Sequence, residues 1–201
     1  MTSYNCTSCG APIEVKNRFS KVIVCPYCDT HHKVNVDGLD PSGKHPKLAE
    51  FPSIFHVGCR GTILGKPFSA LGRLRYKYSG GFFDEWFVDY DGEPAWFAED
   101  EGTFTLFTEM IEAVDLPENI DALKPGQNIL VGDKKVMIKE KGAATIEGGE
   151  GELMHYIEPG TPVKYIDGIW SGKKTSIEFS DDELELFIGQ PLMKRDIVVE
   201  G

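Results

Sequence analysis

From residue 54 onward the chain alternates apolar and polar positions in short runs, most of them bounded by Gly, Pro or Asp. Alternation with a period of two is typical of β-strands that bury one face. The runs predict strands at IFHV, GTIL, RLRYKY, EWFVDY, PAWFAE, TFTLFTE, NILV, KVMIKE, AATIEG, PVKYID, KTSIEF and LELFIG. No long helical period is present, and the pattern allows at most one helical turn, near residues 109–114.

The fold class that this pattern predicts is mainly β, with an all-β body over residues 54–201. The body could form packed antiparallel sheets or two small SH3-like barrels. A faint repeat favours two β modules, over residues 54–122 and 127–195. In this repeat VG at 57–58 recurs at 131–132, and VDYDG at 88–92 resembles KYIDG at 164–168.

The first 36 residues carry four of the five cysteines, Cys6, Cys9, Cys25 and Cys28, in the spacing C-x2-C-x15-C-x2-C. Two residues between thiolates allow a tight turn that aims both sulfurs at one ion, and two such turns build a tetrahedral S4 site. Gly10 and Asp29 follow the two turns, where a positive φ is often needed. The runs IEVK and KVIV predict the two strands of a hairpin between the turns. Residues 1–36 are therefore predicted to form a zinc ribbon that holds one structural Zn²⁺.

Three further features complete the cysteine analysis. His31 and His32 could replace a sulfur, but four thiolates already fill the shell, so both are predicted as exposed histidines at the start of a strand. Iron binding or a redox role is the alternative use of the cysteines. Residues 37–53 have the Pro- and Gly-rich composition of a linker. Cys59 is predicted to be a buried core residue, because His56 lies three positions away and points to the opposite face of a strand.

The charge distribution narrows the choice of partners. The formal net charge is -11, and the segment between Tyr78 and Leu123 holds 13 acidic residues and no Lys or Arg. Such a surface repels phosphate backbones, so nucleic-acid binding through the ribbon is the disfavoured alternative. A basic protein partner or a cationic small molecule fits the charge better. No apolar run approaches the roughly 20 residues that span a bilayer, and the polar start is not a signal peptide, so we expect a cytoplasmic protein.

The stretch RLRYKYSGGFFDEWFVDYDG, residues 73–92, predicts a hairpin over SGGFF. Arg73, Arg75 and Lys77 share one face of its first strand, and Leu74, Tyr76 and Tyr78 share the other. Only even registers place Leu74, Tyr76 and Tyr78 on the face of Trp86, Val88 and Tyr90. One such register pairs Arg75 with Asp89, and another pairs Lys77 with Glu85. Opposite charges meet in both, which explains most of the carboxylates without any chemistry.

Four residues of this region are the candidate interaction surface: Glu85, Trp86, Trp96 and Glu99. The alternative is a hydrolase or small-ligand-binding enzyme in which Glu85 and Glu99 converge in a cleft walled by the two tryptophans. A pocket that holds both carboxylates would favour the enzyme. The chain contains no GxSxG, HExxH, Walker A or GxGxxG motif, so we predict no catalytic residues and a protein that is not an enzyme.

The run GRLRYKYSGGFFDEWFVDYDGEPAWFAEDEG, residues 72–102, resembles the bacterial family named domain of unknown function 4178. The matching positions are Gly72, Arg73, Tyr76, Glu85, Trp86, Trp96, Glu99 and Gly102. The resemblance continues through VMIKEKGAATIEGGEGEL, YIDG and LFIGQPL and covers roughly residues 54–192. It implies no established activity. It implies an N-terminal zinc ribbon in many members and an association with bacterial membrane-stress and scaffold proteins, so a membrane-associated scaffold is the expected kind of partner.

These observations predict a non-enzymatic zinc-ribbon adaptor. We expect it to dock a protein partner through an acidic, aromatic β surface.

Overall fold

The computed structural model describes residues 2–36, 38–44, 47–100, 102–112, 120–155, 158–179 and 184–200. Its strands are β1 (Thr2–Asn5), β2 (Pro12–Val15), β3 (Val22–Val24), β4 (Thr30–Asn35), β5 (Gly38–Lys44), β6 (Arg60–Ile63), β7 (Lys66–Tyr78), β8 (Gly81–Tyr90), β9 (Glu93–Asp100), β10 (Thr103–Glu112), β11 (Asn128–Val131), β12 (Lys134–Leu153), β13 (Pro162–Trp170), β14 (Lys173–Phe179), β15 (Leu184–Leu192) and β16 (Ile197–Glu200). Two short 3-10 turns, Ile120–Ala122 and Lys194–Asp196, complete the described elements. The predicted mainly-β class is confirmed.

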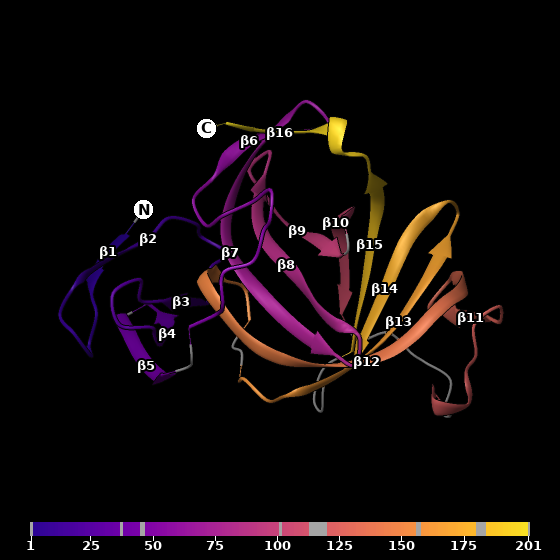
Figure 1. Cartoon of the computed structure of the whole chain (residues 1–201), viewed down its shortest axis with the longest axis horizontal. Coiled ribbons are helices and arrows are strands. Elements are labelled where there is room, and N and C mark those ends of the chain that lie inside the picture. Colours follow the sequence, from indigo (N-terminus) through magenta and orange to yellow (C-terminus); the bar gives the residue numbers. More distant parts are fainter. Residues whose placement is uncertain are drawn as a thin grey trace.

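Eight antiparallel strands form a closed ring in the order β7-β8-β9-β10-β15-β14-β13-β12, and β12 pairs back with β7. The long strand β12 begins beside β11 on the right and ends beside the ribbon on the left (Figure 1). Its first half pairs with β13, and its second half pairs with β7. β6 and β16 extend the sheet beyond β7, and β11 pairs with β12. The body is thus one continuous sheet.

The strand order repeats within this sheet. β6 to β10 form one five-stranded antiparallel meander, and β11 to β15 form a second. Equivalent strands of the two meanders pair with each other, β7 with β12 and β10 with β15. The short sequence matches do not mark equivalent places: the DG of VDYDG is the turn between β8 and β9, whereas KYIDG lies inside β13. The turn that corresponds to Asp91-Gly92 is Ser171-Gly172, and in both turns the two residues have positive φ.

Three apolar clusters fill the two faces of the sheet. The cluster inside the ring takes residues from seven of its strands, with Phe87, Trp96, Phe107 and Phe187 as its largest buried members. A second cluster contains Trp86, Val88, Phe97 and Leu106 and packs under Phe55, β6 and β16. A third is built from isoleucines, valines and Leu186 of the second meander. Side chains alternate between the inside and the outside of the closed ring, so neighbouring residues of one strand belong to different cores.

Glycine is required where β7 and β12 meet. Gly72 and Gly151 are opposite each other in this pairing. A Cβ on Gly72 would lie 2.0 Å from the Glu152 carbonyl oxygen, and one on Gly151 would lie 2.3 Å from the Leu71 carbonyl oxygen. Gly151 also has φ 73°. Both positions therefore exclude any side chain.

The β7–β8 hairpin differs from the predicted one. Its turn is Ser79-Gly80, with Tyr78 opposite Gly81, so Phe82 and Phe83 belong to the strand and not to the loop. Both predicted registers are wrong: Arg75 is opposite Asp84, and Arg73 is opposite Trp86. The turn is three residues shorter than the predicted loop, and this odd-numbered shift of the pairing moves the arginines onto the face of Trp86.

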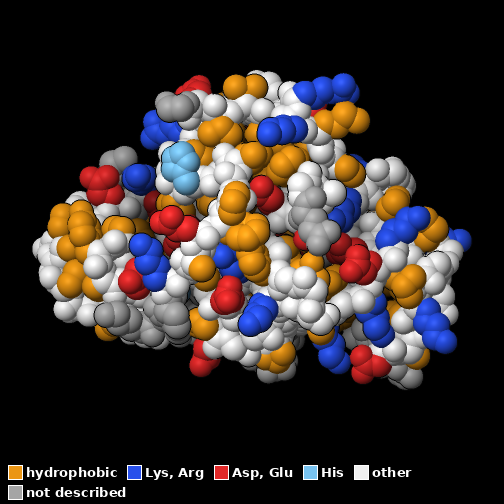
Figure 2. Space-filling model, in the orientation of Figure 1, with side chains coloured by type: hydrophobic (Ala, Val, Ile, Leu, Met, Phe, Trp, Pro, Cys, Tyr) orange, Lys and Arg blue, Asp and Glu red, His pale blue; other side chains and the backbone are white. Residues whose placement is uncertain are grey.

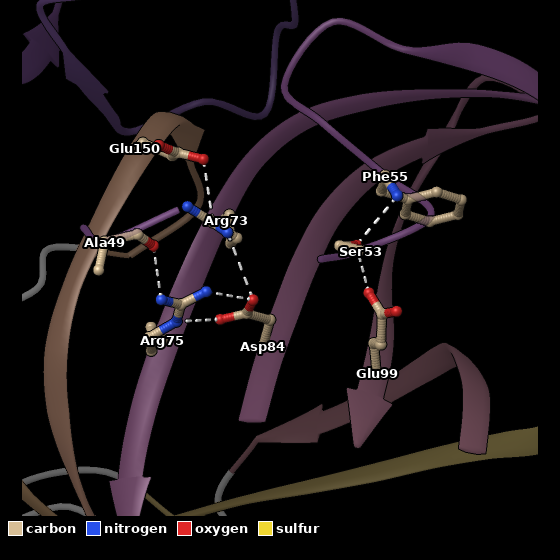
Figure 3. Close-up of polar contacts among 8 residues, drawn as sticks. All are labelled: Ala49, Ser53, Phe55, Arg73, Arg75, Asp84, Glu99 and Glu150. Atoms are coloured by element: carbon tan, nitrogen blue, oxygen red, sulfur yellow. Dashed lines mark hydrogen bonds and ion pairs between the residues drawn. The ribbon is translucent and has the colours of Figure 1, made fainter. Parts of the chain in front are cut away.

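This register creates a buried ion network (Figure 3). Arg75, 1% exposed, donates from Nε and Nη2 to the two Asp84 carboxylate oxygens, each at 2.7 Å, and from Nη1 to the Ala49 carbonyl at 2.8 Å. Arg73 Nη1 lies 3.4 Å from Asp84 Oδ2, and Arg73 Nε lies 2.9 Å from Glu150 Oε1 on β12. The network therefore joins β7 to β8 on one side and to β12 on the other, with a bidentate pair at its centre.

Three strands of the N-terminal region, β3, β4 and β5, continue the same sheet, whereas β1 and β2 form a separate two-stranded sheet. β3 pairs with β12 on one edge and with β4 on the other, and β5, which lies within the segment predicted as a linker, pairs with β4. The predicted pairing of IEVK with KVIV is wrong, because β2 pairs with β1 and β3 pairs with β4. Each cysteine turn thus closes its own short hairpin.

Glu152 anchors the ribbon to the body. Its carboxylate is 4% exposed and accepts hydrogen bonds from the Lys16 and Asn17 backbone N–H groups at 2.9 and 3.0 Å and from Ser20 Oγ at 2.6 Å. The Asn17 side chain donates to Asp89 at 2.8 Å. A buried carboxylate that accepts three hydrogen bonds has its oxygens satisfied, so the contact holds the ribbon against the body.

We expect Asp84→Asn to lower the free energy of unfolding by about 3–5 kcal/mol, because it leaves the Arg75 guanidinium buried without its counter-charge. Urea denaturation of the purified variant measures this loss. The matched control is Asp91→Asn, which removes the exposed pair between Lys66 and Asp91 and should cost under about 1 kcal/mol. Equal losses in the two variants would contradict the role given to the buried network.

Candidate functional site

The two cysteine turns repeat one backbone geometry. Cys6 and Cys9 lie in the turn between β1 and β2, and Cys25 and Cys28 lie in the turn between β3 and β4. The Gly10 N–H donates to the Cys6 carbonyl at 2.9 Å, and the Asp29 N–H donates to the Cys25 carbonyl at 3.0 Å. The predicted positive φ is confirmed at both following positions, 76° and 57°. Each hairpin therefore presents its two sulfurs from a closed, hydrogen-bonded loop.

The four sulfurs converge and could hold one metal ion. All lie within 4.8 Å of one another. Cys6 Sγ lies 3.6 Å from Cys28 Sγ, and Cys9 Sγ lies 3.8 Å from Cys25 Sγ. A regular tetrahedron with Zn–S bonds of about 2.3 Å has sulfur–sulfur edges of about 3.8 Å. The donor set and its spacing therefore fit a tetrahedral thiolate site.

The surroundings of the sulfurs differ: hydrogen bonds lower the pKa of Cys28, whereas burial raises the pKa of Cys25 to about 12. Two backbone N–H groups, from Ser8 and Cys9, donate to Cys6 Sγ at 3.4 Å. Thr30 Oγ1 lies 3.2 Å from Cys28 Sγ, and this hydrogen bond is the main cause that lowers the pKa of Cys28 to about 6. Hydrogen bonds to sulfur spread the negative charge that four thiolates bring to one ion.

His31 and His32 are buried, 1% and 0% exposed, so the prediction that they are exposed is wrong. Their strand β4 lies between β3 and β5, which covers both of its edges. His32 Nε2 lies 3.2 Å from Cys6 Sγ, and burial lowers the pKa of this imidazole. A neutral His32 can donate to the Cys6 thiolate and thereby support a ligand without being one.

The ring encloses a cavity of about 110 Å³ that is lined by acidic and aromatic side chains. Glu85 lines it from β8 and accepts a hydrogen bond from Tyr76. Burial raises the pKa of Glu85 to about 7, and the negative charges of Asp167 and Glu185 add to the rise. Burial and the same carboxylate neighbours raise the pKa of Glu178 well above its ordinary value. The cavity thus concentrates carboxylates that resist ionisation.

The candidate interaction surface is divided between the two faces of the sheet. Glu85 is opposite Ala98 and Trp96 is opposite Phe87, and these side chains face the ring interior. Trp86 is opposite Phe97 in the second core, 1% exposed, and Glu99 lies on the Asp84 side, where it accepts a hydrogen bond from Ser53. The cleft that the enzyme alternative requires, with Glu85, Glu99 and two tryptophan walls, is therefore not formed.

A groove of about 640 Å³ lies where the ribbon meets the body. Ribbon residues of β2, β3 and the second cysteine turn form one wall, and β7, β12 and the segment around Gly58 form the other. Tyr27, between Cys25 and Cys28, is 67% exposed at this groove. Figure 2 shows hydrophobic side chains gathered over the ribbon at the left end of the molecule. The second cysteine turn therefore shapes both the metal site and the groove.

Sequence reasoning missed the residues that join distant strands. Glu152, Ser176 and Glu178 belong to the second meander, and only ring closure brings them to the ribbon or to the cavity. Nothing in the sequence around them signals these contacts. The pairing of Arg75 with Asp84 could have been predicted by placing a two-residue turn at Ser79-Gly80 instead of a five-residue loop. Cys59 is 3% exposed in the second core, as predicted.

The fold and the cysteine cluster define a mainly-β protein with a small four-cysteine ribbon. Residues 56–194 match the family model described as Domain of unknown function (DUF4178), which is more than half of the chain. The chain therefore belongs to this family, and the predicted resemblance is confirmed. No curated protein and no solved structure matches it. Among the described residues, no helix is long and apolar enough to cross a membrane.

Metal removal should unfold the ribbon and leave the ring folded. We expect one metal ion per chain by elemental analysis, because the four cysteines form one cluster. After chelation, amide NMR signals of residues 2–35 should lose their dispersion, since so small a unit buries little core of its own. Signals of β8, β9 and β14 should persist. An unchanged amide spectrum in the metal-free protein would contradict a structural metal.

Glu85 should make stability fall as the pH rises. Its pKa is raised from 4.5 to about 7, so between these pH values the folded chain retains a proton that the unfolded chain has released, and the free energy of unfolding decreases. The charged or titratable groups that face it are Tyr76, Asp167, Lys174, Glu178 and Glu185. Urea denaturation at pH 4.5 and 8 should show a smaller decrease for Glu85→Gln than for wild type. Glu93→Gln, on the surface, should keep the wild-type dependence, and a Glu85→Gln variant that also keeps it would refute this assignment.

Proposed function

We propose that the protein is a non-enzymatic adaptor whose zinc-loaded ribbon and β body together dock an extended segment of a protein partner. The observation that carries the proposal is that the second cysteine turn forms a wall of the groove between ribbon and body. Because this turn folds around the metal site, the shape of the groove depends on the metal. Sites between two packed units are frequent places for binding.

The groove has the size and the backbone for a peptide. Its volume of about 640 Å³ lies within the range of roughly 300–1,000 Å³ found for binding pockets. β2 lines it with Pro12, Ile13 and Glu14, and in the described part of the chain β2 pairs along one edge only, with β1. An unpaired strand edge can accept the backbone of an added extended segment. Tyr27 offers an exposed aromatic contact of the kind that dominates docking energies.

Zinc is the metal that this proposal assigns. Thiolate sulfur suits Zn²⁺, which has no redox chemistry, and a filled S4 shell leaves no position for water or substrate. When bound, the ion would supply folding energy to the ribbon. The four cysteines would hold it, and His32 would orient Cys6.

The catalytic alternative receives little support from the geometry. Glu85 and Glu99 face different sides of the sheet, so they do not form a carboxylate pair. Burial raises the pKa of Cys59, which makes that thiol a poor nucleophile. Nucleic-acid binding through the ribbon stays disfavoured, because the groove brings Glu14, Asp29 and Glu150 beside its basic residues. A membrane-associated scaffold as partner and a cytoplasmic location stay predictions.

Selection from a random peptide library against the zinc-loaded protein tests the proposal. The selected peptides, synthesised with a fluorescent label, should bind the wild type by anisotropy. Tyr27→Ala should weaken binding about tenfold or more, because a central aromatic contact is lost. Replacing Cys25 and Cys28 by Ser should abolish binding, because it removes two of the four sulfurs.

Leu130→Ala is the matched control. Leu130 is 65% exposed on β11, at the opposite end of the molecule from the ribbon, and its loss should leave peptide affinity unchanged (Figure 1). Failure to select any peptide that binds, or binding that is insensitive to both Tyr27 and the metal, would overturn the proposal.

A further inference from the structure

The cavity inside the ring has an electrostatic imbalance that its own residues do not relieve. Lys174 is the one basic side chain among the described residues that line it, and its Nζ lies 3.4 Å from Asp167. Glu85 has Tyr76 as a hydrogen-bond donor. Glu178 has neither a hydrogen bond nor an ion pair within the described part of the chain. The cavity therefore holds more carboxyl groups than basic side chains to pair with them.

An unpartnered hydroxyl lines the same cavity. Ser176 on β14 is 9% exposed, and its Oγ has no hydrogen-bond partner among the residues that the structure describes. It lies opposite Asp167 on one neighbouring strand and Phe187 on the other. Because Ser176 lines the cavity, this hydroxyl is available to hydrogen-bond to a ligand there.

Aromatic rings form part of the cavity wall and are inclined to one another at different angles. Tyr76 and Phe83 stack with their ring centroids 4.9 Å apart. Tyr165 meets Phe83 edge-on, with an interplanar angle of 77° and centroids 6.3 Å apart. Rings that meet at an angle and lie beside carboxylates are the arrangement that binds organic ammonium ions, through cation–π attraction and charge. A bare metal ion would need oxygen ligands where these rings stand.

The opening of the cavity is also acidic. The exposed residues of its lining include Asp100 and Glu140, which come from different halves of the ring. Carboxylates at the rim of a low-dielectric hollow attract cations and repel anions. The volume of about 110 Å³ is nearly four times the roughly 30 Å³ that a water molecule occupies, so the cavity admits only a small ligand.

We propose that the interior of the ring is a binding site for a small organic ammonium ion, held by Glu178 and Glu85 and enclosed by Tyr76, Phe83 and Tyr165. This site is separate from the groove at the ribbon and does not depend on the peptide-docking proposal. Glu178 supplies the unpaired charge, and Ser176 supplies an oxygen that can accept an N–H donor or contact a methylammonium group.

Isothermal titration calorimetry of the full zinc-loaded chain at pH 8 tests the site. The probes are tetramethylammonium chloride and butylammonium chloride, with tert-butanol as the uncharged control and calcium chloride as the metal arm. At least one ammonium ion should bind, and tert-butanol should not. Glu178→Gln should weaken ammonium binding at least tenfold, and Phe83→Leu, which keeps an apolar wall but removes the ring, should weaken it several-fold.

The matched control variant is Glu93→Gln, whose carboxylate is exposed outside the cavity and whose loss should leave ammonium affinity unchanged. Thermal unfolding of each variant checks that it is folded, and Glu178→Gln should be at least as stable as wild type because it removes a buried like charge. Absence of binding by both ammonium ions overturns the proposal. So does equal binding of tert-butanol, tighter binding of calcium, or full affinity in Glu178→Gln.

Discussion

The pairing of β7 with β12 is the contact on which the rest of the structure depends. It closes eight strands into a ring, and it is possible only because Gly72 and Gly151 let two backbones approach to distances that any Cβ would obstruct. Beyond this crossing β12 continues to Glu152, whose side chain receives the ribbon. Next to the crossing, Arg73 of β7 forms an ion pair with Glu150 of β12. Ring closure, attachment of the ribbon and the ion pair between Arg73 and Glu150 therefore depend on one glycine pair.

The same crossing separates two environments that the chain uses differently. Towards the ribbon, β12 and β7 form the body wall of a wide groove, where the opposite wall is set by a cysteine turn. Towards the ring interior, alternate residues of the same strands meet carboxylates and aromatic rings. Because side chains alternate along a strand, Arg75 and Tyr76 are neighbours in sequence but serve an ion network on one side and an acidic cavity on the other. The groove and the cavity, the two proposed sites, thus share one sheet without sharing a lining residue.

Local patterns predicted the elements, and non-local contacts decided their arrangement. The alternation of apolar residues located most strands of the body, and C-x2-C spacing located the four clustered cysteines, because both signals lie within a few residues. The hairpin register was wrong because a turn shorter by three residues also gives plausible charge pairs. The burial of His32 and the partners of Glu85 could not be predicted, since they depend on β5 covering β4 and on strands of the second meander reaching the first. Gly72 and Glu85 lie within the residues that match the family model, and the structure gives each a physical reason: close backbone approach for one and the cavity for the other.

The buried carboxyl groups of the acidic cavity lower the stability of the fold near neutral pH. Glu85 and Glu178 sit where burial raises the pKa of both, so their ionised forms oppose folding near neutral pH. A residue chosen for stability alone would be apolar there, as the isoleucines of the neighbouring core are. Unfavourable polar groups in an otherwise consistent core are expected at functional sites. A cation that binds only the closed ring would relieve the repulsion between these carboxylates, and its binding energy would add to the stability of the folded state. The ring would then be most stable when occupied, and loss of the cation would weaken the β7–β12 contact that also holds the ribbon.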